Sequence, residues 1–262
     1  MSDLRSTGLL CEVHGSGTPV LMLHGLGGSS NTFEPLMPAL GSYRTIRPDL
    51  PGAGRSALPT MQLSVDDILS TVLSVLEAAE VNKAHLVGHS FGTLLCQHLA
   101  MRQPERFLSL TLFGALTEPA QANRAGLRGR AEQVRKNGMT DTADAIVTGS
   151  LSAHTRRSNP IAMAFVRESL MRQTRDGYAA NCEALAGARA VDATRLPCPV
   201  LVVTGREDAV TPVSMGQEIT DKCSTGSLEV LEQCGHWTPI EKPAECASAL
   251  QQFLPAVSTQ RA

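Results

Sequence analysis

Ser90 lies at the centre of the segment Gly88–Gly92, which reads GHSFG and matches the pattern G-x-S-x-G. The apolar residues 84–87 before it are typical of a buried strand, and the apolar residues after it recur at helical spacing. A serine between a strand and a helix sits on a sharp turn that exposes its hydroxyl. Glycines on both sides let the strand and the helix approach without a clash of Cβ atoms. The pattern therefore predicts that Ser90 is a nucleophile rather than part of an ordinary glycine-rich turn.

A serine hydroxyl is a weak nucleophile, so it needs a base to take its proton and an acid to orient that base. His236 lies in the sequence CGHW, shortly after the apolar residues 228–231. Asp208 lies in GREDAVTP, directly after the apolar residues 199–203. Both are thus placed on loops at strand ends, and we expect His236 to be the base and Asp208 the orienting acid. Trp237, which follows the histidine, either packs beside the base or fills the core.

Other polar residues near these motifs are expected to be structural. His24 opens the glycine-rich segment 24–28, and its imidazole is expected to hold that loop through backbone hydrogen bonds rather than act as a second base. Asp49 precedes a proline-glycine turn, where a carboxylate capping turn amides is favoured over an alternative catalytic acid. Glu207 adjoins Asp208 but faces the other way on an extended loop. The remaining histidines expected to be structural lie outside any motif, and they are His14, His85, His98 and His154.

The elements that position these residues follow from the pattern of apolar runs. Short runs alternate along the chain with stretches whose apolar residues recur every three or four positions. Continuous apolar strands joined by helices indicate a parallel sheet covered on both faces, so the fold class is α/β. The predicted strands cover 19–23, 44–49, 84–87, 109–112 and 199–203, one helix covers 65–79, and 256–262 form a frayed end.

The segment 117–190 interrupts this alternation. It contains helical patterns but no run typical of a buried strand, so we predict a helical cap inserted into a core domain formed by residues 1–116 and 191–262. The segment has 11 Lys plus Arg and 7 Asp plus Glu, a net charge of +4 against −6 for the remainder. Its arginines either lie on solvated helix faces or attract an anionic substrate. They are Arg124, Arg128, Arg130, Arg135, Arg156, Arg157, Arg167, Arg172, Arg175 and Arg189.

Composition argues against several classes of protein. A net charge of −2 and 3% aromatic residues do not favour a nucleic-acid partner. No apolar run approaches the roughly 18 residues of a membrane span, and residues 1–13 lack the features of a signal peptide. Seven scattered cysteines without a C-x-x-C pair are typical of core residues in a reducing compartment, so we expect a cytoplasmic protein. No phosphate-binding glycine motif or metal-ligand spacing is present, and we expect no cofactor and no metal.

Five motifs in fixed order resemble the α/β-hydrolases across essentially the whole chain: HGLGG, DLPGAGRS, GHSFG, GREDAVTP and CGHWTPIEKP. The resemblance implies the α/β-hydrolase fold, a mostly parallel central sheet flanked by helices with a helical cap. It also implies that Ser90 is the nucleophile, Asp208 the acid and His236 the base, in the chain order of that superfamily. By the same resemblance, the backbone N–H groups of Leu26 and Phe91 form the oxyanion hole.

A narrower resemblance is to the 3-oxoadipate enol-lactonases, whose subgroup also contains small esterases and haloperoxidase-like enzymes. The end of the insertion, DGYAANCEAL at 176–185, is similar to the end of the lactonase cap, whereas lactonases more often have Met where Phe91 stands. The resemblance implies a carboxylic ester hydrolase acting on a small ester or lactone, which can be anionic. The alternatives are a general carboxylesterase for small neutral esters, a C–C bond hydrolase or perhydrolase with the same three residues, and a ligand sensor with slow hydrolysis.

Overall fold

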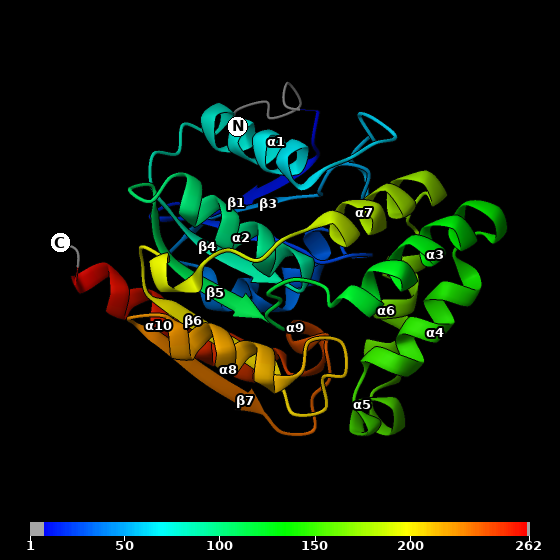
Figure 1. The fold of residues 1–262 in the computed structure, drawn as a ribbon. Helices are drawn as coiled ribbons and strands as arrows, with labels where there is room; N and C mark the ends of the chain where they lie inside the picture. The colour runs from blue at the N-terminus through cyan, green and yellow to red at the C-terminus, as the bar shows by residue number, and fades with distance from the viewer. Residues whose placement is uncertain (1–7, 261–262) are drawn as a thin grey trace.

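Seven strands form one sheet in the order β1-β3-β2-β4-β5-β6-β7 in the computed structural model, which describes residues 8–260 (Figure 1). All neighbouring strands are parallel except β1 and β3, which are antiparallel. This confirms the mostly parallel α/β fold. The strands are β1 (Cys11–His14), β2 (Pro19–Leu23), β3 (Arg44–Pro48), β4 (Ala84–His89), β5 (Phe107–Phe113), β6 (Val200–Gly205) and β7 (Gly226–Leu231).

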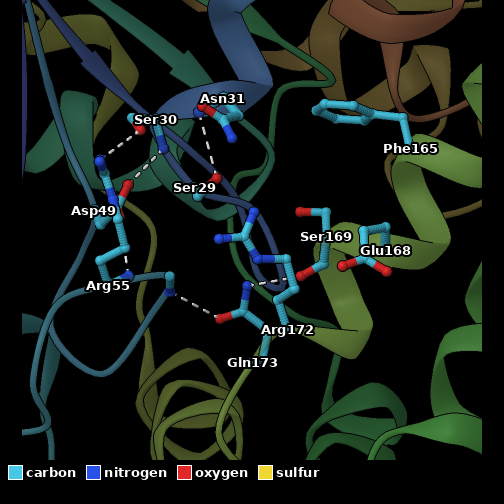
Figure 2. Close-up of a pocket in the computed structure, with 11 residues that line it drawn as sticks. Ser29, Ser30, Asn31, Asp49, Arg55, Phe165, Glu168, Ser169, Arg172 and Gln173 are labelled. Atoms are coloured by element: carbon cyan, nitrogen blue, oxygen red, sulfur yellow. Dashed lines mark hydrogen bonds and ion pairs between the residues drawn. The ribbon is translucent and has the colours of Figure 1, made fainter.

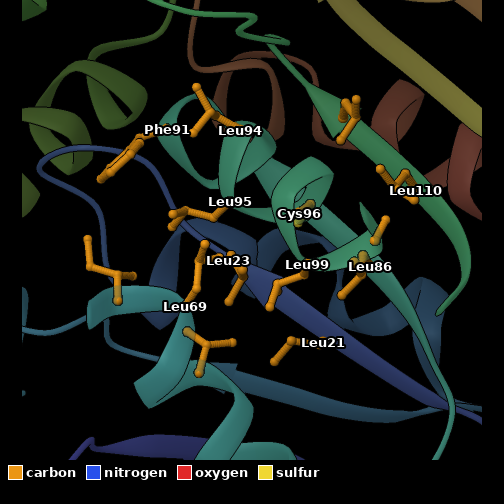
Figure 3. Close-up of a cluster of buried hydrophobic side chains, with 14 of the residues drawn as sticks. Leu21, Leu23, Leu69, Leu86, Phe91, Leu94, Leu95, Cys96, Leu99 and Leu110 are labelled. Carbon is orange, nitrogen blue, oxygen red and sulfur yellow. The ribbon is translucent and has the colours of Figure 1, made fainter. Parts of the chain in front are cut away.

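Side chains along each central strand alternate between two apolar layers because successive residues of a strand point to opposite faces. Leu21 and Leu23 of β2 belong to the layer shared with α1 (Val65–Ala78), α2 (Phe91–Arg102) and α8 (Val213–Lys222). Figure 3 shows part of this layer, with leucines of β2, β4 and β5 against those of α1 and α2. Val20 and Met22 belong to the opposite layer, shared with the 3₁₀ helix η2 (Ser30–Leu40) and α10 (Pro243–Gln260). The short helix α9 (Thr238–Glu241) contacts both η2 and α10.

Helix α1 illustrates how sequence determines an element. Ser64 is its N-cap: the Ser64 hydroxyl accepts a hydrogen bond from the Asp67 amide at 3.1 Å, and the Asp67 carboxylate accepts one from the Ser64 amide at 2.9 Å. This reciprocal pair satisfies amides that the first helical turn leaves free. The buried face then repeats at helical spacing, through Ile68, Leu69, Val72, Val75 and Leu76.

Five helices and a 3₁₀ turn lie between β5 and β6, and no strand occurs in 117–190, all of which is described. This confirms the predicted helical insertion. The helices gather on one side of the sheet (Figure 1). Their buried apolar side chains form a cluster to which Trp237 and the partly buried Leu26 of the sheet loops also belong. The elements are α3 (Gln121–Asn137), α4 (Thr140–Ser150), α5 (Ala153–Ser158), α6 (Pro160–Met171), α7 (Arg175–Gly187) and the turn η3 (Ala193–Arg195). We refer to α3–α7 as the helical insertion.

Two elements differ from the sequence prediction. Strand β1 was not predicted, because this short edge strand is only half buried and lacks a continuous apolar run. The frayed end predicted from residue 256 is wrong as far as Gln260, since α10 continues to that residue and buries Val257. Residues 1–7, on which part of the signal-peptide prediction rests, and residues 261–262 lie outside the described part. Within residues 8–260, no helix combines the length and the apolar character needed to cross a bilayer.

Candidate active site

Ser90 occupies the turn between β4 and α2 with φ 52° and ψ −119°, a conformation that residues other than glycine rarely adopt. Such a strained backbone persists only where the surrounding structure fixes it. Gly92 is one such constraint, since a Cβ atom there would lie 1.9 Å from the carbonyl oxygen of Leu23. A Cβ atom on Gly88 would lie 2.7 Å from the Gly92 carbonyl. The sharp turn inferred from GHSFG is therefore present, and both glycines are required by close packing.

The structure brings together the three residues expected to form the triad. Asp208 follows β6 and His236 follows β7, while Ser90 follows β4, so all three lie at the carboxyl ends of parallel strands. His236 Nε2 lies 2.8 Å from Ser90 Oγ, and His236 Nδ1 lies 2.9 Å from Asp208 Oδ2. A carboxylate only accepts, so Nδ1 carries the imidazole proton and Nε2 is free to accept the serine proton. This arrangement can transfer a proton from Ser90 to His236.

The Asp208 carboxylate is held by its own loop. Its Oδ1 accepts hydrogen bonds from the amides of Val210 and Thr211, each at 2.8 Å, and its Oδ2 accepts one from the Thr211 hydroxyl at 2.7 Å. Burial alone would raise the pKa of Asp208, but the charge and hydrogen bond of His236 and the bonds from Thr211 outweigh it and lower the pKa. Asp208 is thus a fixed anion beside His236.

Thr211 was not singled out from the sequence. Its hydroxyl also lies 3.2 Å from His236 Nδ1, so it contacts both members of the acid–base pair. The spacing Asp-x-x-Thr was the available signal, because an Asp side chain commonly bonds backbone amides two and three residues later.

His89 was also missed, although it is the residue before the predicted nucleophile. Its Nε2 donates to the carbonyl of His236 at 3.0 Å, and its ring centroid lies 5.2 Å from the rings of both His236 and Trp237. Burial, reinforced by repulsion from His236, lowers the pKa of His89 to about 3. His89 is therefore a neutral donor that supports the backbone at His236.

Leu26 and Phe91 lie where the resemblance predicts the two oxyanion donors. Phe91 is the first residue of α2, and the first amides of a helix have no acceptor within it. Leu26 lines the same cavity as Ser90, and its neighbour Gly25 packs so closely that a Cβ atom there would lie 2.7 Å from Ser90 Cβ. Leu26 thus lies in the loop that packs against Ser90, Phe91 directly follows Ser90 in the chain, and the role of their amides as oxyanion donors stays a prediction.

His24 holds the loop 24–28, as expected. The Leu50 amide donates to His24 Nε2 at 2.9 Å, so the proton must be on Nδ1, which donates to the Gly25 carbonyl at 2.8 Å. Burial lowers the pKa of His24 and keeps it neutral. Both ring nitrogens are used in backbone bonds, which confirms the structural interpretation.

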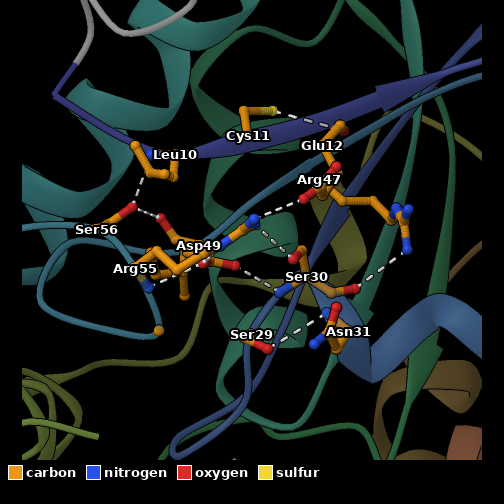
Figure 4. Close-up of polar contacts among 12 residues, drawn as sticks. Leu10, Cys11, Glu12, Ser29, Ser30, Asn31, Arg47, Asp49, Arg55 and Ser56 are labelled. Carbon is orange, nitrogen blue, oxygen red and sulfur yellow. Dashed lines mark hydrogen bonds and ion pairs between the residues drawn. The ribbon is translucent and has the colours of Figure 1, made fainter. Parts of the chain in front are cut away.

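Asp49 caps backbone amides, also as expected (Figure 4). Its carboxylate accepts from the Ser30 amide at 2.7 Å, the Arg55 amide at 3.0 Å and Arg55 Nε at 2.9 Å. Burial raises the pKa of Asp49, and the stronger effect of these bonds lowers it below the usual value. Glu207, the other carboxylate considered, accepts from the Ala153 amide at 2.7 Å and forms no hydrogen bond to His236 among the described residues.

Three of the four other histidines also bond to structural partners. His14 Nδ1 lies 3.3 Å from an Arg47 guanidinium nitrogen, and His85 Nδ1 lies 2.7 Å from the Ser109 hydroxyl. His98 Nε2 donates to the carbonyl of Arg189 at 2.8 Å.

A cavity of about 320 Å³ lies between the strand-end loops and the helical insertion. Ser90, His236 and Trp237 line it from the loops. The insertion contributes apolar side chains and a polar group of residues, namely Arg130, Gln133, Asp141 and Thr142. Of the ten insertion arginines, Arg130 alone lines this cavity, and it forms no ion pair with the described residues. No cluster of metal-ligating side chains was found among residues 8–260.

Two buried polar atoms on the wall of this cavity lack a hydrogen-bond partner among the described residues, Trp237 Nε1 and the Tyr178 hydroxyl. Burial raises the pKa of Tyr178, and Arg130 is close enough to oppose that shift, although no well-formed bond joins the two. Both atoms are buried, so of these groups Arg130, which is partly exposed, is the one open to a polar ligand in the cavity.

A second cavity of about 290 Å³, which we call the outer pocket, lies between Ser29–Asn31 and the C-terminal half of α6 (Figure 2). Its described lining includes neither Ser90 nor His236, so it is separate from the candidate active site.

Comparison with known proteins places the whole chain in one group. A family model described as alpha/beta hydrolase fold matches residues 18–243. The 2-hydroxymuconate semialdehyde hydrolase of Pseudomonas sp. (strain CF600) is 32% identical over 265 residues, which cover 96% of this chain and 93% of that protein. The 3-oxoadipate enol-lactonase 2 of Acinetobacter baylyi is 31% identical over 213 residues, or 81% of this chain and 79% of that protein. A solved esterase of Thermogutta terrifontis aligns with a TM-score of 0.91 at 24% identity, covering 95% of this chain and 93% of its own.

Proposed function

Because the chain belongs to the alpha/beta hydrolase fold family, as its ordered motifs predicted, we propose that it is a serine hydrolase of carboxylic esters. One observation carries the proposal: a chain of hydrogen bonds runs from Ser90 Oγ through His236 to Asp208, at 2.8 and 2.9 Å. Together with the strained turn that holds Ser90, this is the arrangement that acyl transfer by a serine nucleophile requires.

In the proposed reaction, Ser90 Oγ attacks the ester carbonyl carbon while His236 Nε2 takes the hydroxyl proton. Asp208 keeps the other imidazole proton on Nδ1 and stabilises the positive charge that His236 acquires. The N–H groups of Leu26 and Phe91 bind the oxyanion, an effect of about 3–4 kcal/mol per donor in comparable enzymes. His236 then protonates the leaving oxygen, and a water activated by the same residue releases the acid and restores Ser90.

The proposed substrate class is a small lactone or ester that carries a carboxylate, as the name of the enol-lactonase relative suggests. Arg130 supports this class, because an arginine without an ion pair on a cavity wall prefers to bind an anion. We propose that residues 117–190 form a cap that covers this cavity and selects the substrate. A cavity of about 320 Å³ also suits a small molecule.

Hydrolysis of a C–C bond by the same three residues is a second candidate. The observation that favours it is the 32% identity to a 2-hydroxymuconate semialdehyde hydrolase over 96% of this chain. Cleavage of a C–C bond requires protonation of a carbon leaving group, whereas ester cleavage requires protonation of oxygen.

A substrate panel tests the proposal. Purified protein and Ser90→Ala are compared on carboxylate-bearing lactones, their methyl esters, neutral p-nitrophenyl esters and diketones. We expect many turnovers per molecule on lactones and esters and none with Ser90→Ala. Turnover of diketones alone would favour the C–C hydrolase, and a single slow turnover would favour the ligand sensor.

We also propose a reducing compartment, the cytoplasm, as the site of action. All seven cysteines are free thiols in the described residues, and five of them are buried. Cell fractionation of the source organism tests this, and recovery of the protein outside the cytoplasm would contradict it.

A further inference from the structure

The loop 24–28 is bonded to the helical insertion as well as to the sheet. The Ser169 hydroxyl of α6 donates to the Gly27 carbonyl at 2.8 Å. Gln173, which follows α6, donates from Nε2 to the carbonyls of Gly27 and Gly28, each at 3.2 Å, and to the carbonyl of Ser169 at 2.9 Å. The two carbonyls that follow Leu26 therefore receive hydrogen bonds from the insertion.

Gln173 also binds a second loop of the core. Its Oε1 accepts from the Gly54 amide at 3.1 Å, as Figure 2 shows together with the bond to Ser169. The backbone N–H of Gly54 can only donate, so its partner on Gln173 must be Oε1, and Nε2 of the same side chain points toward the loop 24–28. Gln173 is 6% exposed and uses both ends of its amide. A carboxylate or an apolar side chain of this length could not make both sets of bonds.

The contact between α6 and the nucleophile is continuous. Gly27 has φ +78°, and a Cβ atom there would lie 2.3 Å from Leu170 Cδ2, so the loop lies directly against α6. At the other end of the loop, Gly25 packs against Ser90. Leu26 lies between these two contacts, and a displacement of Gly27 and Gly28 would move the Leu26 amide relative to Ser90.

From these contacts we infer that Gln173 is a positioning residue for the oxyanion hole, with Ser169 as its lesser partner. The helical insertion thereby does more than cover the cavity: its docked position places the Leu26 N–H toward the developing oxyanion. The inference rests on the proposed function, because it concerns the same reaction at Ser90. In this inference, the helical insertion is linked to the loop 24–28 by hydrogen bonds that lie outside the substrate cavity, beside the outer pocket.

The test compares Gln173→Met, which keeps length but removes both sets of bonds, with Ser169→Ala. Glu168→Gln is the control for the same region, since Glu168 lines the outer pocket but its side chain forms no hydrogen bond to the loop 24–28 among the described residues. Ser158→Ala is the matched serine control, because its hydroxyl donates at 2.8 Å to a carbonyl within the insertion. Steady-state kinetics on a neutral p-nitrophenyl ester are measured with phenylboronic acid inhibition, which reports on the tetrahedral geometry at Ser90.

Loss of one oxyanion donor typically lowers kcat by a factor of about 10²–10³. We expect Gln173→Met, which displaces rather than removes a donor, to lower kcat by about 10- to 100-fold with KM within about threefold. Phenylboronic acid binding should weaken by a similar factor. Ser169→Ala should lower kcat by about three- to fivefold, and both controls should stay within about twofold of the parent.

An unchanged kcat in folded Gln173→Met, or a higher KM with kcat unchanged, would overturn the inference. The helical insertion would then serve only to cover the cavity. If Gln173→Met does not fold, Ser169→Ala against Ser158→Ala decides in the same way. Amide hydrogen exchange of residues 25–28 provides a measurement that needs no turnover. Faster exchange in Gln173→Met supports the inference and equal exchange contradicts it, even if Ser90-dependent hydrolysis, and with it the proposed function, were absent.

Discussion

The catalytic residues expected in the strand-end loops and the polar residues of the helical insertion differ in how fully their polar groups are paired. In the loops, His236 and His24 use both ring nitrogens in hydrogen bonds, and Asp208 accepts four. On the insertion side, Arg130 has no ion pair and the Tyr178 hydroxyl has no hydrogen-bond partner among the described residues. The residues that we propose to act in every reaction cycle are thus held by several hydrogen bonds, whereas Arg130, which we propose to bind the substrate, forms no ion pair with the described residues.

The largest effect that this comparison predicts is for Ser90→Ala. Loss of a triad member typically lowers turnover by about 10⁴–10⁶. The fold should persist, since removing one hydroxyl opens no core cavity. Hydrolysis of p-nitrophenyl acetate and thermal unfolding measure the two properties. Activity at a tenth of the parent rate would mean that another group is the nucleophile.

Asp208→Asn should lower turnover by a factor on the order of 10⁴, because the amide no longer holds His236 in the required tautomer. Asp49→Asn is the matched control at a second buried carboxylate of the core. It should lower turnover less than about tenfold but destabilise the protein by about 1–3 kcal/mol, since it weakens bonds to Ser30 and Arg55. A larger loss of turnover for Asp49→Asn would move the acid role to that residue.

The sequence predicted the role of a residue well where that role depends on neighbours close in the chain. The turn at Ser90 was predictable because its strain and close packing demand glycines at 88 and 92, which are visible in the sequence. The positions of Asp208 and His236 were predictable because each follows an apolar strand within a recognisable motif. The backbone role of His24 followed from its place at the start of a glycine-rich loop.

Long-range contacts left no such pattern. Gln173 contacts Gly54 and Gly27, residues 119 and 146 positions away in the chain, and an isolated glutamine has no periodicity to reveal this. The ten arginines of residues 117–190 looked alike in sequence, and only the folded structure, in which Arg130 alone among them lines the cavity with Ser90, distinguishes this residue. His89 was overlooked because its role depends on a carbonyl 147 residues later.

Arg130→Met should separate substrate selection from chemistry. A charge-assisted hydrogen bond to a substrate carboxylate contributes about 1.5–3 kcal/mol, or roughly 10- to 150-fold in kcat/KM. We expect that loss for a carboxylate lactone and little change for its methyl ester, and added salt should reduce the parent's preference. Arg128→Met, an exposed neighbour outside the cavity lining, is the control. An equal preference for the methyl ester in the parent would favour the general esterase.

The last effect is one on folding stability and not on turnover: the dependence of the unfolding free energy on pH, which should arise in the core at His89. The folded pKa of His89, about 3, lies below the ordinary histidine value near 6.5, so between these values only the unfolded chain binds the proton. Stability contributed by the neutral ring is present above the unfolded pKa and is lost as pH falls toward the folded pKa, by about 1.4 kcal/mol per unit. His89→Gln keeps a donor for the His236 carbonyl but has no such titration. The unfolding free energy of the parent should therefore fall more steeply than that of His89→Gln between pH 6 and 4 in urea denaturation. Parallel curves for the parent and His89→Gln would show that His89 takes up a proton in the folded protein as readily as in the unfolded chain.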